Sequence, residues 1–286
     1  MAQVRDKAAK YITPPARPFT IRSPKLFYWF KTWELLFSTL GKLRRDKEIR
    51  RHTSLSHDEY QTYDDWEMRA FEAGSTYTFN HGRMERVSFR VIRAASLAPI
   101  VDQIKGLLAQ DHIGPLRVLE VGSGNGTNLM LLKAAFPTEI VFSGIEISAQ
   151  RIAQGHQYWG ARLAGIDIQV DSAISLDTLP DDAFDVVFSI HCLEQLPYDT
   201  LACVRSMDRV SRNLVICVEP VWEYANRAQK LYALFGDQQR TLLPVMRTAG
   251  LDILRAYPLE VLANPLNKSG VIIAKTSLVE GHSRPD

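Results

Sequence analysis

The chain has 286 residues, of which 46% are hydrophobic and 23% charged, a composition typical of a folded globular protein and not of a disordered or fibrous one. No stretch approaches the roughly 20 uninterrupted apolar residues of a membrane-spanning helix, and the N-terminal segment lacks the apolar core of a secretory signal. The three cysteines, Cys192, Cys203 and Cys217, show no metal-ligand spacing and cannot all pair. We therefore expect a cytoplasmic protein with reduced thiols and no metal site.

The net charge of +2 is unevenly distributed along the chain. Residues 1–55 contain 13 Lys or Arg against four Asp or Glu, a net +9, and the remainder carries −7. Such a basic arm can contact an anionic membrane surface or nucleic acid, or fold back onto the acidic body. The sequence leaves these interpretations open, so a location peripheral to the inner face of a membrane stays among the expectations.

Residues 1–110 are expected to form a basic, helical N-terminal extension without strands. Ser23 and Pro24 are typical of a helix start. Apolar residues at helical spacing then continue to residue 40 and predict an amphipathic helix. This helix would either cover the rest of the protein or lie on a lipid surface.

Between residues 111 and 278, strand and helix patterns alternate, which is typical of a parallel sheet covered by helices on both faces. Residues 279–286 are expected to be a tail. Runs rich in β-branched and aromatic residues predict seven strands, which begin near residues 116, 140, 166, 184, 213, 252 and 271.

The most informative motif is VLEVGSGNGTN, at the end of the first of these strands. Glu120 ends the strand, and Gly122, Gly124 and Gly126 form the turn into a helix. Closely spaced glycines allow a sharp bend and let a ligand lie against the backbone. A dinucleotide fingerprint would have glycine in place of Thr127, and the acid would repel a diphosphate. Glu120 instead suits a ligand that carries an ammonium or sulfonium charge.

Two further strand ends carry polar groups that suit a nucleoside. Glu146 ends the second strand, 20 residues after Gly126, where its carboxylate can accept hydrogen bonds from both ribose hydroxyls. Asp171 and Ser172 follow the third strand and offer an acceptor for an adenine amino group. The fourth strand ends at residues 189–191, opposite the expected reactive end of the ligand.

Four motifs in this order, VLEVGSGNG, GIEIS, DSA and FDVVFSIHCLEQLP, resemble those of class I S-adenosylmethionine-dependent methyltransferases of the small-molecule or glycan type, over about residues 115–276. The resemblance implies an α/β, Rossmann-like seven-stranded sheet with a reversed last strand. It also implies S-adenosylmethionine as cofactor, bound across the strand ends, and methyl transfer to an acceptor. The positions expected to bind the cofactor are Glu120, Gly122, Ser123, Gly124, Gly126, Glu146, Ile147, Asp171, Ser172, Ser189 and His191.

His191 is the leading candidate for a catalytic residue. Methyl transfer from a sulfonium is a direct in-line displacement, so the enzyme mainly positions its substrates and excludes water. A hydroxyl acceptor also benefits from a general base, and histidine has a suitable pKa. His191 follows the fourth strand directly, with Glu194 three residues later. The alternative is that His191 only lines the methionine end of the cofactor, a role this position often has in the family.

The acceptor is expected to contact Tyr77 in the segment 71–89, predicted as a loop leading into a helix, and Trp222 and Tyr224 after the fifth strand. Aromatic groups suit a sugar, a phenol or an isoprenoid tail equally. We therefore expect a small-molecule, glycan or lipid-linked acceptor, methylated at oxygen, with nitrogen as the open alternative. The segment after the fourth strand, SIHCLEQLPY, lacks the Asn-Pro-Pro-Tyr stretch common in the family members that methylate adenine in DNA or glutamine, which argues against that subgroup.

Three other functions stay open at this stage. They are RNA methylation guided by the basic arm, non-catalytic binding near a membrane, and nicotinamide-dependent oxidoreduction. A nucleic-acid partner is not expected, because the chain shows no recognisable RNA-binding module and its body is acidic. The sequence predicts no oligomeric state.

Overall fold

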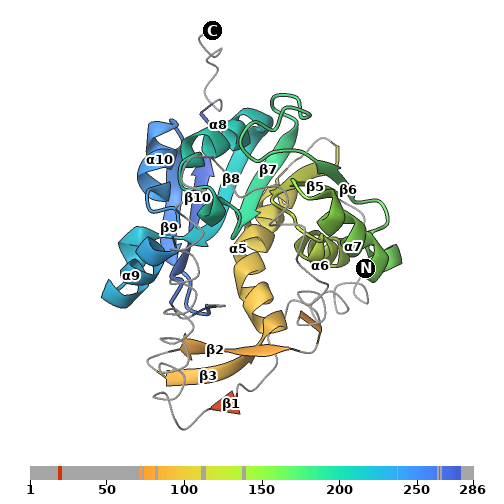
Figure 1. Cartoon of the computed structure of the whole chain (residues 1–286). Coiled ribbons are helices and arrows are strands. Elements are labelled where there is room, and N and C mark those ends of the chain that lie inside the picture. Colours follow the sequence, from red (N-terminus) through yellow and green to blue (C-terminus); the bar gives the residue numbers. More distant parts are fainter. Residues whose placement is uncertain are drawn as a thin grey trace.

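The computed structural model describes residues 19–20, 71–72, 74–80, 83–110, 114–136, 140–236, 238–262, 264 and 266–277. At its centre lies a seven-stranded sheet with the strand order β6-β5-β4-β7-β8-β10-β9 (Figure 1). The strands are β4 (Leu116–Val121), β5 (Ile140–Glu146), β6 (Asp167–Val170), β7 (Phe184–Ile190), β8 (Ser211–Pro220), β9 (Asp252–Pro258) and β10 (Ser269–Lys275).

The strand directions confirm the expected topology. Strands β4 to β8 pair in parallel, whereas β10 pairs antiparallel to both β8 and β9. The last strand of the chain is therefore reversed, and all seven predicted strands are present. From β4 the chain builds outward through β5 and β6 on one side, and later through β7 and β8 on the other. The carboxyl ends of β4 and β7 thus meet at a topological switch point, where α/β sheets bind ligands.

Helices cover both faces of the sheet (Figure 1). Successive side chains of a strand point to opposite faces, so the buried central strands need helices on both sides of the sheet. Val118 packs in a buried cluster with α5, α6 and the end of α7, whereas Leu119 packs on the other face with α8 and α10. The helices are α5 (Phe89–Leu108), α6 (Thr127–Ala135), α7 (Ala149–Trp159), α8 (Thr200–Val210), α9 (Arg227–Phe235) and α10 (Leu242–Thr248), and the 3-10 turns are η1 (Gly160–Leu163), η2 (Leu193–Gln195) and η3 (Trp222–Tyr224).

The N-terminal region corrects one expectation. Part of the segment predicted as a loop is a hairpin of β2 (Ser75–Asn80) and β3 (Arg83–Ser88), which β1 (Phe19–Thr20) extends to three strands. In the pairing register Asn80 lies opposite Arg83. The prediction of no strands before residue 110 was therefore wrong. Aromatic and polar residues alternate in β2, and the Asn-His-Gly sequence that follows is typical of a tight hairpin, although β3 shows no such alternation. The predicted helix after this segment is present as α5.

Helix α5 packs into the main core, although its residues fall within the expected extension 1–110. Leu97, Ile100 and Ile104 are completely buried in the cluster that also contains β4 and β7. The predicted amphipathic helix that ends at residue 40 lies outside the described residues. None of the helices described by the structure is both long and apolar enough to span a bilayer.

Candidate active site

The turn between β4 and α6 has a backbone that only glycine adopts readily. Gly122, Gly124 and Gly126 have φ angles of 74°, 58° and 75°, in the left-handed region that other residues avoid. A Cβ atom on Gly122 would lie 2.3 Å from the Cys192 sulfur, and one on Gly124 would lie 2.8 Å from the Arg151 guanidinium. The glycines therefore allow both the bend and the close packing of the β7 end and α7 around it.

Glu146, at the end of β5, holds this turn from the neighbouring strand. Its Oε2 accepts a hydrogen bond from the Gly124 N–H at 2.8 Å, and its Oε1 accepts one from the Ser148 N–H at 3.0 Å. The Arg151 guanidinium lies 3.8 Å from Oε2. A carboxylate has about four acceptor positions, so Glu146 can also accept hydrogen bonds from hydroxyl groups of a ligand in the cavity it lines.

Glu120 is 1% exposed and differs from the charged group that the sequence suggested. The Asn128 side-chain amide donates to Glu120 Oε1 at 2.5 Å, whereas Oε2 has no hydrogen-bond partner among the described residues. Burial raises the pKa of Glu120 to about 8, although the hydrogen bond from Asn128 acts to lower it. At pH 7 the carboxyl group is therefore mainly neutral, and a cation beside Oε2 would favour its ionised form.

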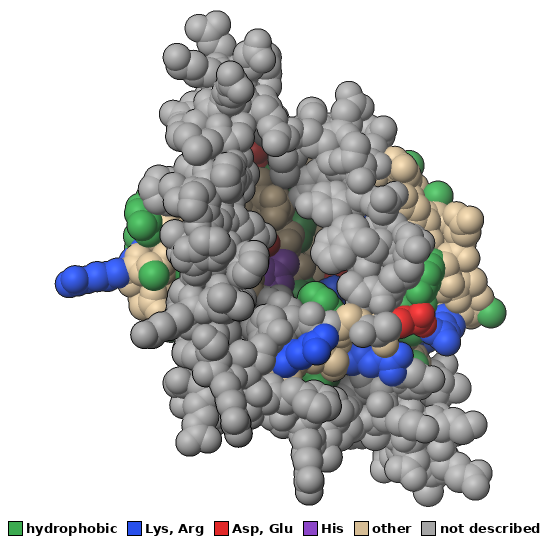
Figure 2. Space-filling view, turned by 60° about the horizontal axis from the view of Figure 1, so that its bottom comes forward, with side chains coloured by type: hydrophobic (Ala, Val, Ile, Leu, Met, Phe, Trp, Pro, Cys, Tyr) green, Lys and Arg blue, Asp and Glu red, His purple; other side chains and the backbone are tan. Residues whose placement is uncertain are grey.

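Two cavities meet above the strand ends. The first cavity lies beside Glu146 and Ile147, between the ends of β5 and β6 and the segment after β7. The second cavity lies between α5, the glycine turn and the start of α6. Gly122, Arg151 and His191 line both cavities, so one ligand can extend from the first to the second. In the space-filling view, a histidine side chain lies at the floor of a hollow on this face (Figure 2).

Asp171 lines the first cavity but also holds its own loop. Its Oδ2 accepts hydrogen bonds from the Thr178 N–H at 2.9 Å and the Thr178 hydroxyl at 2.6 Å, and its Oδ1 accepts one from the Ser172 N–H at 2.7 Å. Although burial acts to raise the pKa of Asp171, these hydrogen bonds outweigh it and lower that pKa below its ordinary value. The structure thus gives Asp171 a loop-forming role, and its contact with an adenine amino group stays a prediction.

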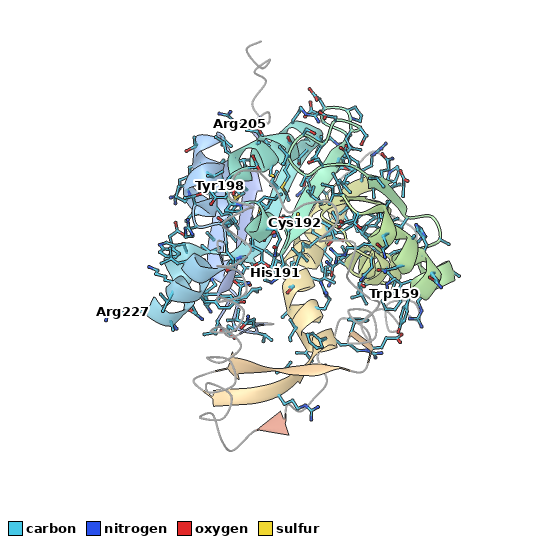
Figure 3. All side chains as sticks on the ribbon, in the orientation of Figure 1. Trp159, His191, Cys192, Tyr198, Arg205 and Arg227 are labelled. Atoms are coloured by element: carbon cyan, nitrogen blue, oxygen red, sulfur yellow. The ribbon has the colours of Figure 1, made fainter. Side chains whose placement is uncertain are left out.

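His191 follows β7 and lies near the middle of the molecule with Cys192 (Figure 3). Its Nδ1 is 3.5 Å from Glu194 Oε1, and its Nε2 is 3.2 Å from the Ser269 hydroxyl. The Asn267 side-chain amide donates to Glu194 Oε2 at 2.7 Å and fixes that carboxylate. Burial acts to lower the pKa of His191, but the charge of Glu194 and its hydrogen bond outweigh burial and raise it above the ordinary value. A carboxylate, an imidazole and a hydroxyl are thus aligned at the junction of the two cavities.

Glu219, on β8, supports the segment that carries His191. Its carboxylate accepts hydrogen bonds from the backbone N–H groups of Cys192 at 2.9 Å, Leu193 at 3.1 Å and Glu194 at 3.3 Å. Burial raises the pKa of Glu219 to about 7. This side chain therefore orients the turn that presents both His191 and Glu194.

The remaining predicted site residues are placed less directly. Ser189 is completely buried within β7 and lines neither cavity. Trp222 and Tyr224 lie in η3 beyond the carboxyl end of β8, but neither lines the two cavities. The Lys230 ammonium lies 5.1 Å from the centroid of the Trp222 ring. The backbone of Tyr77 is in β2, and its side chain is outside the described structure.

Sequence reasoning missed four residues around these cavities. Arg93 on α5 and Arg151 on α7 had no motif to mark them, because they are ordinary helix positions. Asn128 lies in the first turn of α6, eight residues after Glu120. Glu219 could have been found by the reasoning that identified Glu146, since both lie near the carboxyl end of a parallel strand.

The donor and acceptor groups present fit S-adenosylmethionine. Glu146 offers acceptors for ribose hydroxyls, and Ile147, Ala173 and Ile174 give the first cavity apolar walls for a purine. At the other end, Glu120 lines neither cavity, but its Oε2 atom is buried without a hydrogen-bond partner among the described residues, next to Asn128, which lines the second cavity.

Comparison with known proteins agrees with this assignment. Residues 118–213 match a family model described as a methyltransferase domain. Ajmaline N-methyltransferase from Rauvolfia serpentina is 36% identical over 99 residues, which cover 34% of this chain and 33% of that enzyme. The match thus spans about a third of the length of this curated relative.

Solved structures with low sequence identity share the fold. The [4+2]-cyclase SpnF superposes with a TM-score of 0.56 at 19% identity, covering 78% of this chain and 97% of that one. Magnesium protoporphyrin IX methyltransferase from Synechocystis PCC 6803, with bound SAH, gives a TM-score of 0.53 at 15% identity, covering 77% and 97% of the two chains.

Proposed function

We propose that this chain, in which residues 118–213 match a methyltransferase domain, is a class I S-adenosylmethionine-dependent methyltransferase that transfers the methyl group of S-adenosylmethionine to a small-molecule acceptor. The observation that carries the proposal is the pair of acids at adjacent strand ends. Glu146 both braces the glycine turn and lines the first cavity, and Glu120 keeps an unpartnered, buried oxygen on the other side of the turn. This arrangement suits a nucleoside joined to a cationic amino-acid group better than it suits a diphosphate.

When bound, S-adenosylmethionine supplies an electrophilic methyl group on a sulfonium sulfur. The chain's own residues orient the reactants. Glu146 would hold the ribose, the apolar side chains of Ile147 and Ile174 would contact the purine, and His191 would lie near the methyl group because it lines the junction of the two cavities. Fixing two reactants in line supplies about 7 to 11 kcal/mol of the barrier.

The proposed acceptor atom is a hydroxyl oxygen, and His191 is its proposed general base. His191 Nε2, which lies 3.2 Å from the Ser269 hydroxyl, would accept the proton of an acceptor hydroxyl that takes the place of Ser269, and S-adenosylmethionine would supply the methyl group to the acceptor oxygen. Glu194, 3.5 Å from Nδ1, stabilises the imidazolium that results. The ionised Glu194 is available for this, since the neighbouring His191 lowers its pKa despite the opposing effect of burial.

The size of the acceptor follows from what lies beyond the cavities. Trp222 and Tyr224 line neither cavity, so an acceptor that contacts them has to extend beyond both cavities. Glycan and lipid-linked hydroxyl compounds are therefore the acceptor classes to test together with other small molecules. Apart from Phe19–Thr20, the basic arm lies outside the described residues, so the alternatives of RNA methylation and membrane association gain no support from the geometry of the site.

The test uses S-adenosylmethionine with a deuterated methyl group. The enzyme is incubated with the small-molecule fraction of a cell extract, and mass spectrometry searches for a compound that gains one labelled methyl group. We expect His191→Ala to reduce the formation of this product by about 100-fold or more with little change in cofactor affinity, as removal of a general base does. His156→Ala, on the exposed surface of α7, is the control.

Two results would contradict parts of this proposal. Unchanged product formation by His191→Ala would remove the general-base assignment. Binding of the cofactor with no labelled product from any extract, glycan or lipid fraction would indicate a non-catalytic binding protein instead.

A further inference from the structure

The reversed strand β10 begins at the edge of the sheet where the parallel strands end. Because β10 runs antiparallel to β8, its first residue, Ser269, pairs with Pro220, the last residue of β8. The start of β10 therefore lies beside the segment that carries His191, and the Ser269 hydroxyl is 3.2 Å from His191 Nε2. These C-terminal residues lie outside the range 118–213 that matches the family model.

Asn267, two residues before β10, is fixed by its own backbone. Its N–H donates to the Asn264 carbonyl oxygen at 2.9 Å, and its carbonyl oxygen accepts a hydrogen bond from the Ser269 N–H at 3.0 Å. Its side chain is buried and donates to Glu194 Oε2 at 2.7 Å, across 73 residues of sequence. A tight turn thus holds an amide donor against a carboxylate that comes from a distant element.

The buried Glu194 carboxylate needs this donor. Its Oε1 lies 3.5 Å from His191 Nδ1 and accepts a longer hydrogen bond, of 3.4 Å, from the Gln195 side chain. Burial acts to raise the pKa of Glu194, but the charge of His191 and the hydrogen bonds from His191 and Asn267 outweigh it and lower that pKa. A buried carboxylate that loses a donor ionises less readily, and a neutral Glu194 would not stabilise an imidazolium.

Three charged groups act on the His191 imidazole, namely Glu194 on η2, Glu219 on β8 and Arg93 on α5. Burial acts to lower the pKa of His191, the two acids act to raise it, and Arg93 acts to lower it, with a net rise. Glu219 is held by backbone N–H groups, whereas Glu194 receives its shortest hydrogen bond from Asn267. The effect of Glu194 on the imidazole therefore depends on Asn267.

We propose that Asn267 is a positioning residue for the transfer, whose side-chain amide keeps Glu194 ionised and beside His191 Nδ1. With Nδ1–H directed to Glu194, Nε2 is the nitrogen that can accept the proton of the acceptor hydroxyl. This inference rests on the proposed function, because the role of His191 as general base belongs to it. It makes the turn before the reversed strand a part of the support for the base.

The test uses two variants of Asn267 that differ in charge, with the pKa of His191 measured by NMR on the full chain without ligands. Asn267→Leu removes the donor, so we expect the pKa of His191 to fall. Asn267→Asp keeps the shape and leaves at least one negative charge beside Nδ1, so the pKa should be higher than in Asn267→Leu. The control Asn264→Leu alters the same turn, but the Asn264 side-chain amide donates to the Tyr232 hydroxyl, so the pKa of His191 should stay unchanged.

Activity gives a second readout once an acceptor is found. We expect Asn267→Leu to lower kcat by about 10- to 100-fold, the usual effect of losing a hydrogen bond to a charged group, and to leave the KM for S-adenosylmethionine unchanged. The rising limb of its pH–activity profile should move to lower pH, because that limb follows the pKa of His191.

The possible failures are distinguishable. If Asn267→Leu lowers the melting temperature but leaves the pKa of His191 unchanged, or if Asn264→Leu lowers that pKa equally, Asn267 has a purely structural role and the proposal is wrong. If the pKa values change as expected but no acceptor is methylated by the unmodified chain, the contact between Asn267 and Glu194 acts as inferred and the proposed function fails.

Discussion

Binding of the cofactor should release a proton from Glu120. The pKa of this buried carboxyl group is about 8, against an ordinary value of 4.5, and the difference corresponds to on the order of 5 kcal/mol opposing its ionisation. At pH 7 about 90% of the molecules therefore carry a neutral Glu120. An ammonium group beside Oε2 favours the ionised form and lowers this pKa, so ligand binding and proton release are coupled.

Isothermal titration calorimetry in buffers of different ionisation enthalpy measures this coupling. With S-adenosylhomocysteine we expect close to one proton to be released per ligand at pH 7 and fewer at pH 8, because the fraction of neutral Glu120 falls as the pH approaches its pKa. The same experiment on His191→Ala separates any contribution of the imidazole. Methylthioadenosine, which lacks the ammonium group, should release almost none.

Glu120→Gln is the decisive variant for this coupling, since it keeps the side-chain size but cannot ionise. We expect proton release to disappear in this variant. Equal proton release by Glu120→Gln and the unmodified chain, or release that does not fall between pH 7 and pH 8, would refute the reasoning.

Two further predictions concern the turn and the histidine. Gly155→Ala should abolish S-adenosylhomocysteine binding and lower the melting temperature, because its Cβ would lie 2.2 Å from the Asn125 carbonyl oxygen. The control Gly106→Ala, whose Cβ meets nothing within 4 Å, should raise the free energy of unfolding by up to about 1 kcal/mol. Equal melting temperatures of the two variants would contradict this prediction. Glu194→Gln should lower the pKa of His191, because the charge of Glu194 raises that pKa in the unmodified chain. NMR of the imidazole measures the pKa, and the rising limb of the pH–activity profile should shift to lower pH with it. An unchanged pKa of His191 would exclude the dependence on Glu194.

The sheet could be predicted from the sequence because its signals are local. The central parallel strands β4, β7 and β8 are short apolar runs that are buried on both faces. Ser148 caps α7 as expected, accepting a hydrogen bond from the Arg151 N–H. The hairpin of β2 and β3 was missed because segment 71–89 was interpreted as a loop leading into a helix, although the Asn-His-Gly sequence that begins at Asn80 is a hairpin signal. Most of the basic arm, residues 1–55, lies outside the described residues, so the expectations for it are not compared with the structure.

The candidate site could be predicted only where function coincides with a strand end. Glu120 and Glu146 were found in this way, and the structure places both beside the glycine turn. The protonation of Glu120 could not be predicted, since it depends on how completely the folded chain buries this side chain. The same holds for Ser269, which reaches His191 across 78 residues of sequence, and for Arg93, whose position follows from how α5 packs.

The most direct test of the central claim, that the crevice at the ends of β4 and β5 binds an adenosyl sulfur compound, is a calorimetric titration of the unmodified chain with S-adenosylhomocysteine and, separately, with a nicotinamide dinucleotide. We expect one molecule of S-adenosylhomocysteine to bind per chain and the dinucleotide to give no binding heat. Binding of the dinucleotide without binding of S-adenosylhomocysteine would contradict it.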